Sequence, residues 1–224
     1  YGTRLAEYTQ DIPKPMVKIG NDPILTHIMR IYSLFGFKNF IIAAGYKKEI
    51  IIDYYKNSKE FPNLQIVDTG KDTMTGGRIL RLKSYFNENE KFFMTYGDGL
   101  CNINLQKLKK FHDSHGKLAT ITAVHPPVRF GELEIEDHKV IQFEEKPQAK
   151  AVWINGGFFI FNYEIFNYIK DDNTIFEKQP LENLAKDEQL MAYTHQGSWK
   201  CMDSLKDKKD LDKMWDEKKI FWKK

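Results

Sequence analysis

The alternation of short apolar runs with helix-period segments between residues 23 and 124 constrains the fold more than any other feature of this sequence. Apolar residues recur at helical spacing over 23–35, and a strand-like run at 40–44 follows directly. The same alternation continues through 47–57 (helical), 64–67, 77–86 (helical), 92–96, 104–115 (helical) and 118–124. Strands that alternate with helices predict an α/β fold, with a mostly parallel central sheet and helices on both faces.

The pattern of predicted elements changes from about residue 131 onward. Short strand-like runs follow one another closely there, with helical patterns between them, at 131–135, 139–143, 152–161, 163–169 (helical), 177–187 (helical), 190–202 and 204–218 (helical). This spacing predicts a smaller, more antiparallel part. Because 224 residues fit one domain, we expect two halves, 1–130 and 131–224, of a single continuous unit.

Charge, hydropathy and cysteine content narrow the possible classes of protein. The 34 basic and 31 acidic residues give a net charge of +3, which argues against a nucleic acid or an anionic membrane as partner. Uninterrupted apolar runs stay below the roughly 18 residues that suggest a membrane span. Cys101 and Cys201 lie far apart and in no metal-type spacing, so a reduced, cytoplasmic protein is expected.

The sequence lacks the motifs of several enzyme classes: Walker-type GxxxxGK[ST], GxSxG, HExxH and a complete GxGxxG. His112 and His115 lie three residues apart on a predicted helix, but no third ligand accompanies them. We therefore expect solvated histidine side chains there rather than a metal site.

Small and charged residues gather at the ends of predicted strands, where open α/β sheets bind their ligands. Glycine lets a backbone approach a phosphate, and an arginine pairs two phosphate oxygens at once, so Gly2-Thr3-Arg4 could bind phosphate. Lys14 lies between two prolines that limit its backbone freedom. Arg4 alone would suggest a basic surface loop, whereas Gly2, Arg4 and Lys14 together favour phosphate binding.

Two aspartates could hold a divalent cation. Asp98, in Tyr96-Gly97-Asp98-Gly99, directly follows an apolar run, although a tight Asp-Gly turn explains the segment about equally well. Asp203 lies between a predicted strand and the last helix, where it could also be the N-cap. If the two carboxylates converge, they form a Mg²⁺ site of the usual kind, completed by substrate phosphates.

Three further segments could contact substrate. Lys146, which follows Glu145 at a strand end, could neutralise a phosphate, or the pair could simply end a hairpin. Asn155, in Asn155-Gly156-Gly157, could bind sugar hydroxyls, with a β-bulge as an equal alternative. Backbone N–H groups over 75–78 could read a base edge or bind an anion, although an ordinary loop and helix cap is favoured there.

Taken together and in this order, these segments resemble the sugar-1-phosphate nucleotidylyltransferases. The similarity rests on GTRL, KPM, the aspartate after the central strand, EKP, NGG and the late aspartate, and the longer segments VDTGKDTMTGGR, FMTYGDG and INGGFFIFN are closest to the cytidylyltransferases of that family. The resemblance implies a Rossmann-like nucleotidyltransferase fold and Mg²⁺ as cofactor. It also implies transfer of a nucleotidyl group from a triphosphate, expected to be CTP, to a sugar-1-phosphate, expected to be glucose-1-phosphate.

The resemblance assigns roles by position and leaves a homo-oligomer possible. The implied catalytic residues are Arg4, Lys14, Asp98 and Asp203, of which the two aspartates would bind the metal. The implied nucleotide-binding residues are Gly2, Thr3, Arg4, Lys14, Thr75, Gly76, Gly77, Arg78 and Gly97. The implied sugar-phosphate-binding residues are Gly131, Glu145, Lys146, Asn155, Gly156 and Trp199.

Two departures from the family pattern keep other functions open. The family's opening strand and paired glycines are expected before Tyr1, and the family carries an insert between the segments that match Tyr55 and Leu64. Another pair of triphosphate and sugar phosphate, with UTP, dTTP or GTP, is therefore an alternative, as is a regulatory homologue that binds sugar nucleotides without making them. A glycosyltransferase would need Asp-x-Asp, and Leu100 stands two residues after Asp98.

Overall fold

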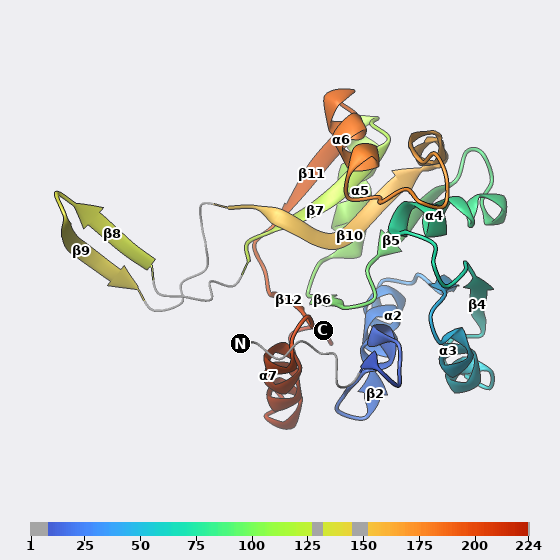
Figure 1. The fold of residues 1–224 in the computed structure, drawn as a ribbon, viewed down its shortest axis with the longest axis horizontal. Coiled ribbons are helices and arrows are strands. Elements are labelled where there is room, and N and C mark those ends of the chain that lie inside the picture. Colours follow the sequence, from blue (N-terminus) through green and yellow to red (C-terminus); the bar gives the residue numbers. More distant parts are fainter. Residues whose placement is uncertain (1–8, 127–131, 145–151, 224) are drawn as a thin grey trace.

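The computed structural model describes residues 9–126, 132–144 and 152–223, and its centre is a four-stranded sheet (Figure 1). Its strands are β5 (Lys91–Thr95), β7 (Ala119–Val124), β10 (Ile154–Asn162) and β11 (Leu190–His195), in the order β11-β7-β10-β5. β11 runs parallel to β7, whereas β10 is antiparallel to both of its neighbours. Three of its four strands therefore share one direction, but two of the three neighbouring pairs are antiparallel, so the sheet is mixed rather than mostly parallel.

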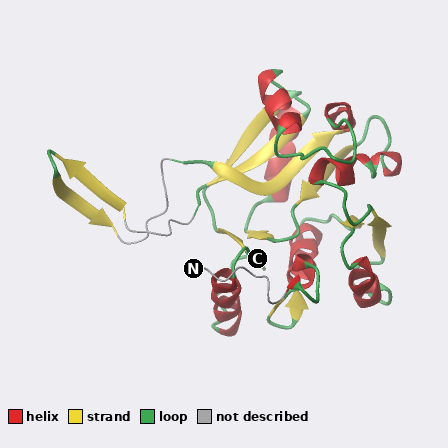
Figure 2. Ribbon diagram, viewed as in Figure 1, coloured by secondary structure: helices red, strands yellow, loops and turns green. Residues whose placement is uncertain are grey.

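β10 buries both of its faces, which explains its nearly continuous apolar sequence. On one face, Phe158 and Ile160 belong to a core that includes residues of α2 (Ile24–Leu34) and α5 (Leu105–His115). On the other face, Phe159 and Phe161 pack in a second core with Leu184 of α6 (Gln179–Lys186). Helices thus cover both faces of the sheet, as the sequence predicts (Figure 2).

A parallel pair, β3 (Asn39–Ala44) and β4 (Asn63–Asp68), lies beside this sheet and is followed in chain order by α4 (Thr75–Leu80). Helix α3 (Lys48–Tyr55) connects the two strands, and Ile51 and Tyr55 bury its inner side in a third core. A cavity of about 1080 Å³ lies between β3 and β5, with residues of both strands in its wall. Its lining also includes Thr75, Tyr96 and Glu177.

The remaining elements are short. β6 (Gly99–Cys101) pairs antiparallel with β12 (Trp199–Cys201), β1 (Lys18–Ile19) with β2 (Asp22–Pro23), and β8 (Glu132–Glu136) with β9 (Lys139–Glu144). Helix α7 (Leu205–Asp216) follows β12. The 3-10 turns are η1 (Lys14–Met16), η2 (Lys83–Tyr85) and η3 (Tyr163–Tyr168).

Several elements of the second half, 131–224, differ from those predicted. The strand expected at 152–161 is β10, in the middle of the main sheet rather than in a separate antiparallel part, because a segment apolar on both faces needs cover on both. The strand expected at 190–202 is two strands in two different sheets, and it breaks around Gly197. The helix expected at 163–169 is the 3-10 turn η3, which ends with Ile169 N–H bonded to the Phe166 carbonyl.

His112 is buried, contrary to the expectation of a solvated side chain. Its Nδ1 lies 2.8 Å from Thr120 Oγ1 and its Nε2 3.0 Å from Asn162 Oδ1. His115 Nε2 lies 2.8 Å from the same Thr120 hydroxyl, so the pair forms a hydrogen-bonded link between α5 and the sheet. Among the helices of the described ranges, none is both long and apolar enough to cross a bilayer.

Candidate active site

The amino group of Lys14 joins two acidic side chains that are distant in sequence. Lys14 Nζ lies 2.6 Å from Asp98 Oδ2 and 2.6 Å from Asp203 Oδ1. Although burial alone lowers the pKa of Lys14, the two carboxylates outweigh this effect and raise the pKa above its ordinary value. Lys14 is therefore an ammonium throughout the physiological range, and it shares its charge between both acids.

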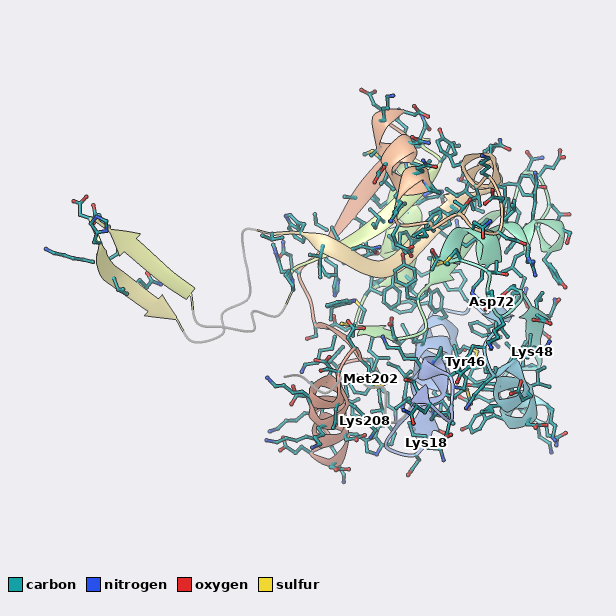
Figure 3. All side chains as sticks on the ribbon, in the orientation of Figure 1. Lys18, Tyr46, Lys48, Asp72, Met202 and Lys208 are labelled. Carbon is teal, nitrogen blue, oxygen red and sulfur yellow. The ribbon has the colours of Figure 1, made fainter. Side chains whose placement is uncertain are left out.

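Backbone pairing explains why the two acids meet. Gly99 of β6 is opposite Cys201 of β12, and the next residue, Met202, donates its N–H to the Asp98 carbonyl at 2.9 Å. Met202 is fully buried, and it lies shortly before α7 in the chain, near that helix in Figure 3. This antiparallel contact brings residue 98 beside residue 203, so the convergence follows from the ends of two short strands.

Asp203 is not the N-cap of α7, which was one of the two roles considered for it. Ser204 caps the helix instead, since its hydroxyl accepts from Asp207 N–H while the Asp207 side chain accepts from Ser204 N–H. The Asp203 carboxylate therefore points toward Lys14 and Cys201, and Cys201 Sγ donates to Asp203 Oδ2 at 3.1 Å.

Gly97 allows the Lys14 turn to pack against the end of β5. A Cβ atom at position 97 would lie 2.7 Å from Pro15 Cγ, which is closer than carbon atoms approach. Pro13 and Pro15 restrict the backbone on either side of Lys14, and Met16 N–H donates to the Pro13 carbonyl to close the turn. Glycine at 97 and proline at 15 together set how near the lysine comes to Asp98.

The Asn155-Gly156-Gly157 segment contains the β-bulge considered above. The register of β10 against β7 shifts after Asn155, and Gly157 has a positive φ of 76°. Asn155 Oδ1 accepts from Gly157 N–H at 2.8 Å, and Trp199 Nε1 donates to the Gly156 carbonyl at 2.8 Å. Trp199, two residues before Cys201, thereby brings the bulge next to the paired acids.

Two N–H groups at the start of α4 are already used by hydrogen bonds within the protein. Gly76 and Gly77 donate theirs to the Thr174 carbonyl, at 2.9 and 3.3 Å. The Arg78 guanidinium donates to Thr69 Oγ1, to the Gly70 carbonyl and to the Lys71 carbonyl. The favoured alternative, an ordinary loop and helix start, therefore accounts for these backbone groups, and Arg78 holds the 69–71 loop.

The carboxylate of Glu177, which the sequence did not single out, links residues that follow β5 and begin α4. Glu177 accepts from the Tyr96 hydroxyl at 2.6 Å and from Thr75 Oγ1 at 2.6 Å. These partners lie 81 and 102 residues away along the chain, so no local pattern could have indicated the cluster. Asn155 Nδ2 lies 3.4 Å from the same Tyr96 hydroxyl.

Several residues implied by the resemblance lie outside the described ranges: Gly2, Thr3, Arg4, Gly131, Glu145 and Lys146. Within the described ranges, no group of three or more His, Cys, Asp or Glu side chains could hold a metal ion. Asp98 and Asp203 still fit Mg²⁺, because that ion is commonly bound by one or two carboxylates together with substrate phosphates and water.

Comparison with known proteins gives this geometry a family. The Nucleotidyl transferase family model matches residues 1–212, which is most of the chain. The chain belongs to the nucleotidyl transferase family. The transferase is 43% identical to the glucose-1-phosphate cytidylyltransferase of Salmonella typhi, over 99% of this chain and 95% of that protein.

More distant relatives share the same fold. Mannose-1-phosphate guanyltransferase beta-B of Xenopus laevis is 31% identical to the transferase, over 92% of this chain and 60% of that protein. The crystal structure of HddC from Yersinia pseudotuberculosis matches with a TM-score of 0.73 at 26% identity, over 96% of this chain and 95% of that one. The Rossmann-like nucleotidyltransferase fold predicted from the sequence is confirmed by this likeness.

Proposed function

We propose that the transferase moves a cytidylyl group from CTP to glucose-1-phosphate, giving CDP-glucose and pyrophosphate. The observation that carries this proposal is the meeting of Lys14, Asp98 and Asp203, of which the first two are next in sequence to Pro15 and Gly97 of the cavity wall. The choice of CTP and glucose-1-phosphate is supported by the identity to the Salmonella protein, which covers nearly the whole of both chains.

Charge is the main physical difficulty of this reaction. A nucleoside triphosphate and a sugar phosphate bring on the order of six negative charges into one site. Two like charges 4 Å apart repel by roughly 4 kcal/mol at an effective dielectric of 20, so several cations have to be gathered there. Lys14 supplies one cation from the described residues, and Arg4 and Lys146 are proposed to supply two more.

Asp98 and Asp203 would hold Mg²⁺, which when bound supplies further positive charge to the phosphates. The Lys14 ammonium offsets part of the negative charge of the two carboxylates and, with substrate present, can pair with phosphate oxygens. Both roles require a group that stays protonated, and the raised pKa of Lys14 provides it.

The reaction is an in-line displacement at the α-phosphorus. A phosphate oxygen of the sugar-1-phosphate forms the new bond to that phosphorus, the bond to the oxygen that bridges the α- and β-phosphates breaks, and the electron pair leaves with pyrophosphate. Atoms and electrons balance without a covalent enzyme intermediate. The protein's contribution is then to position the two substrates and to stabilise charge.

A different pair of substrates is the second candidate. The Xenopus relative is a mannose-1-phosphate guanyltransferase, and a second crystal structure of HddC is a complex with GMP-PN. The same acids and lysine would serve any nucleoside triphosphate, because they act on phosphates rather than on the base. The base is selected elsewhere in the cavity.

Pyrophosphate release tests the proposal directly. The transferase is incubated with each of CTP, UTP, dTTP and GTP in combination with several sugar-1-phosphates and Mg²⁺. We expect release to be fastest with CTP and glucose-1-phosphate, and a different best pair would replace the substrates while keeping the reaction class. If no pair releases pyrophosphate above background, the proposed function is wrong.

The variant Asp98→Asn ties the activity to this site. We expect its turnover to fall at least about 100-fold, a loss of the size seen when one transition-state charge partner is removed. Glu217→Gln is the matched control, because Glu217 is an acid that pairs with lysines, Lys213 at 3.7 Å and Lys219 at 2.8 Å, at the end of α7 opposite to Asp203. The control should retain near-normal turnover. Equal losses in both variants would remove Asp98 from the proposed site.

A further inference from the structure

The carboxylate of Glu177 lies at the junction of three segments that border the site. Tyr96 comes from the end of β5, Thr75 from the start of α4, and Asn155 from the bulge of β10. Both carboxylate oxygens of Glu177 are used, one by the Tyr96 hydroxyl and the other by the Thr75 hydroxyl. Hydrogen bonds to a charged acceptor at 2.6 Å are in the short, strong range.

We propose that Glu177 is a positioning residue for nucleotidyl transfer: it fixes the Tyr96 side chain and, through it, the Gly97–Asp98 turn that carries one of the two paired acids. This inference rests on the proposed function. Glu177 lies outside the segments that carry the family resemblance, and its contacts in the folded chain point to this role.

The backbone and the ring of Tyr96 contact β10 directly, whereas its hydroxyl reaches Glu177. Its backbone N–H donates to the Gly157 carbonyl at 3.0 Å, and its ring packs edge-on against Phe159 with 5.5 Å between ring centroids. A Cβ atom on Gly157 would come within 2.9 Å of the Tyr96 ring, so the bulge and the ring are in close contact. The hydroxyl is oriented by Glu177, with Asn155 at 3.4 Å behind it.

The Tyr96 hydroxyl donates to Glu177 Oε1 at 2.6 Å, so a short hydrogen bond to a carboxylate fixes the end of this side chain. Tyr96 is two residues before Asp98. Movement of the Tyr96 side chain would therefore also displace the Gly97–Asp98 turn, which packs against Pro15.

Glu177 is not needed to attach its own segment to α4. Other contacts already do so: Phe176 N–H donates to Thr75 Oγ1 at 2.9 Å, and Gly76 N–H donates to the Thr174 carbonyl at 2.9 Å. Asp172 also pairs with Arg81, whose Nε lies 2.9 Å from Asp172 Oδ1. The specific contribution of the Glu177 side chain is therefore its bond to Tyr96 rather than general stability.

The test compares Glu177→Gln with Asp172→Asn in the full chain, by pyrophosphate release and by thermal melting. Glutamine keeps the shape of the side chain but offers one acceptor oxygen instead of two and no charge. We expect kcat of Glu177→Gln to fall roughly tenfold, as for loss of one hydrogen bond to a charged group, with the KM of each substrate within about threefold of wild type. Asp172→Asn, which loses a contact of the same segment, should keep kcat within about twofold.

Tyr96→Phe provides an independent check, because it removes the same hydrogen bond from the other partner. If the bond acts as proposed, the double variant loses no more kcat than the worse single variant. Three results would each overturn the positioning role. They are a double variant whose loss of kcat is the product of the two single losses, an unchanged kcat in Glu177→Gln, and an equal loss of kcat in Asp172→Asn. An inactive wild-type chain with every substrate pair would instead overturn the proposed function, and this inference with it.

Discussion

Replacing Lys14 by methionine tests the balance of charge at the site. Methionine keeps much of the side-chain volume and removes the ammonium that Asp98 and Asp203 share. The two carboxylates then face each other without a counter-charge, and a divalent cation is the natural replacement. We expect Lys14→Met to bind Mg²⁺ or Mn²⁺ more tightly than wild type in the absence of substrate, while its turnover falls by orders of magnitude.

The expected size of the effect follows from exposure. The side chains of Lys14 and Asp98 are 31% and 28% exposed, but that of Asp203 is 54% exposed, so solvent screens the second pair strongly. Each pair at such a site contributes about 0.5–1 kcal/mol, which gives roughly 1–2 kcal/mol for the two. Since about 1.4 kcal/mol is tenfold in affinity, metal binding should tighten roughly tenfold.

Titration of the substrate-free chain with Mn²⁺, followed by electron paramagnetic resonance or calorimetry, measures this change. Lys219→Met is the matched control, because it removes an equal charge from another acid, Glu217, at the C-terminal end of α7. The control should leave metal affinity within about twofold, as expected for a screened distant charge. Unchanged or weaker metal binding in Lys14→Met would show that the lysine does not compete for these acids, and the assignment of the metal site would fail.

Two further predictions concern packing and pH. Gly97→Ala should lower turnover with little change in substrate KM, since its Cβ would meet Pro15 Cγ at 2.7 Å and push the Lys14 turn away. Steady-state kinetics measures this change. A variant that folds well and has a normal kcat would contradict the prediction. Burial lowers the pKa of His112 and of His115 in the native state, so the unfolded chain binds more protons below about pH 6.5 and native stability falls as the pH drops through that value. Urea unfolding between pH 8 and pH 5 should show this loss in wild type and a shallower dependence in His112→Gln, and identical slopes would refute it.

The first half of the fold was predictable because local pattern and tertiary environment agree there. The apolar period over 23–35 became α2, and the run at 40–44 became β3, with boundaries shifted by about one residue. The predicted segment at 104–115 became α5, with Asn104 as its N-cap and Gly116 at its C-terminal end. In each of these segments the spacing of the apolar residues alone defines which face of the helix or strand is buried in the core.

The second half was less predictable because its elements are defined by distant partners. Whether β10 lies at the edge or in the centre of a sheet depends on β5 and β7, which are far away in sequence. The convergence of Asp98 with Asp203 could be guessed only from resemblance, whereas the hydrogen bonds of Glu177 could not be guessed at all. Single-residue roles that arise from contacts between segments have no periodic signature for a sequence pattern to reveal.

The pairing of β6 with β12 makes the acid pair a late product of folding. The loop closed between residues 98 and 203 includes three strands of the main sheet, β7, β10 and β11, so this contact carries a large entropic cost until those strands are assembled. A growing polypeptide that has not yet emerged past Cys201 contains Asp98 but lacks its acidic counterpart. Recovery of enzyme activity during refolding therefore reports completion of the tertiary structure, and trails any spectroscopic signal that follows the sheet alone.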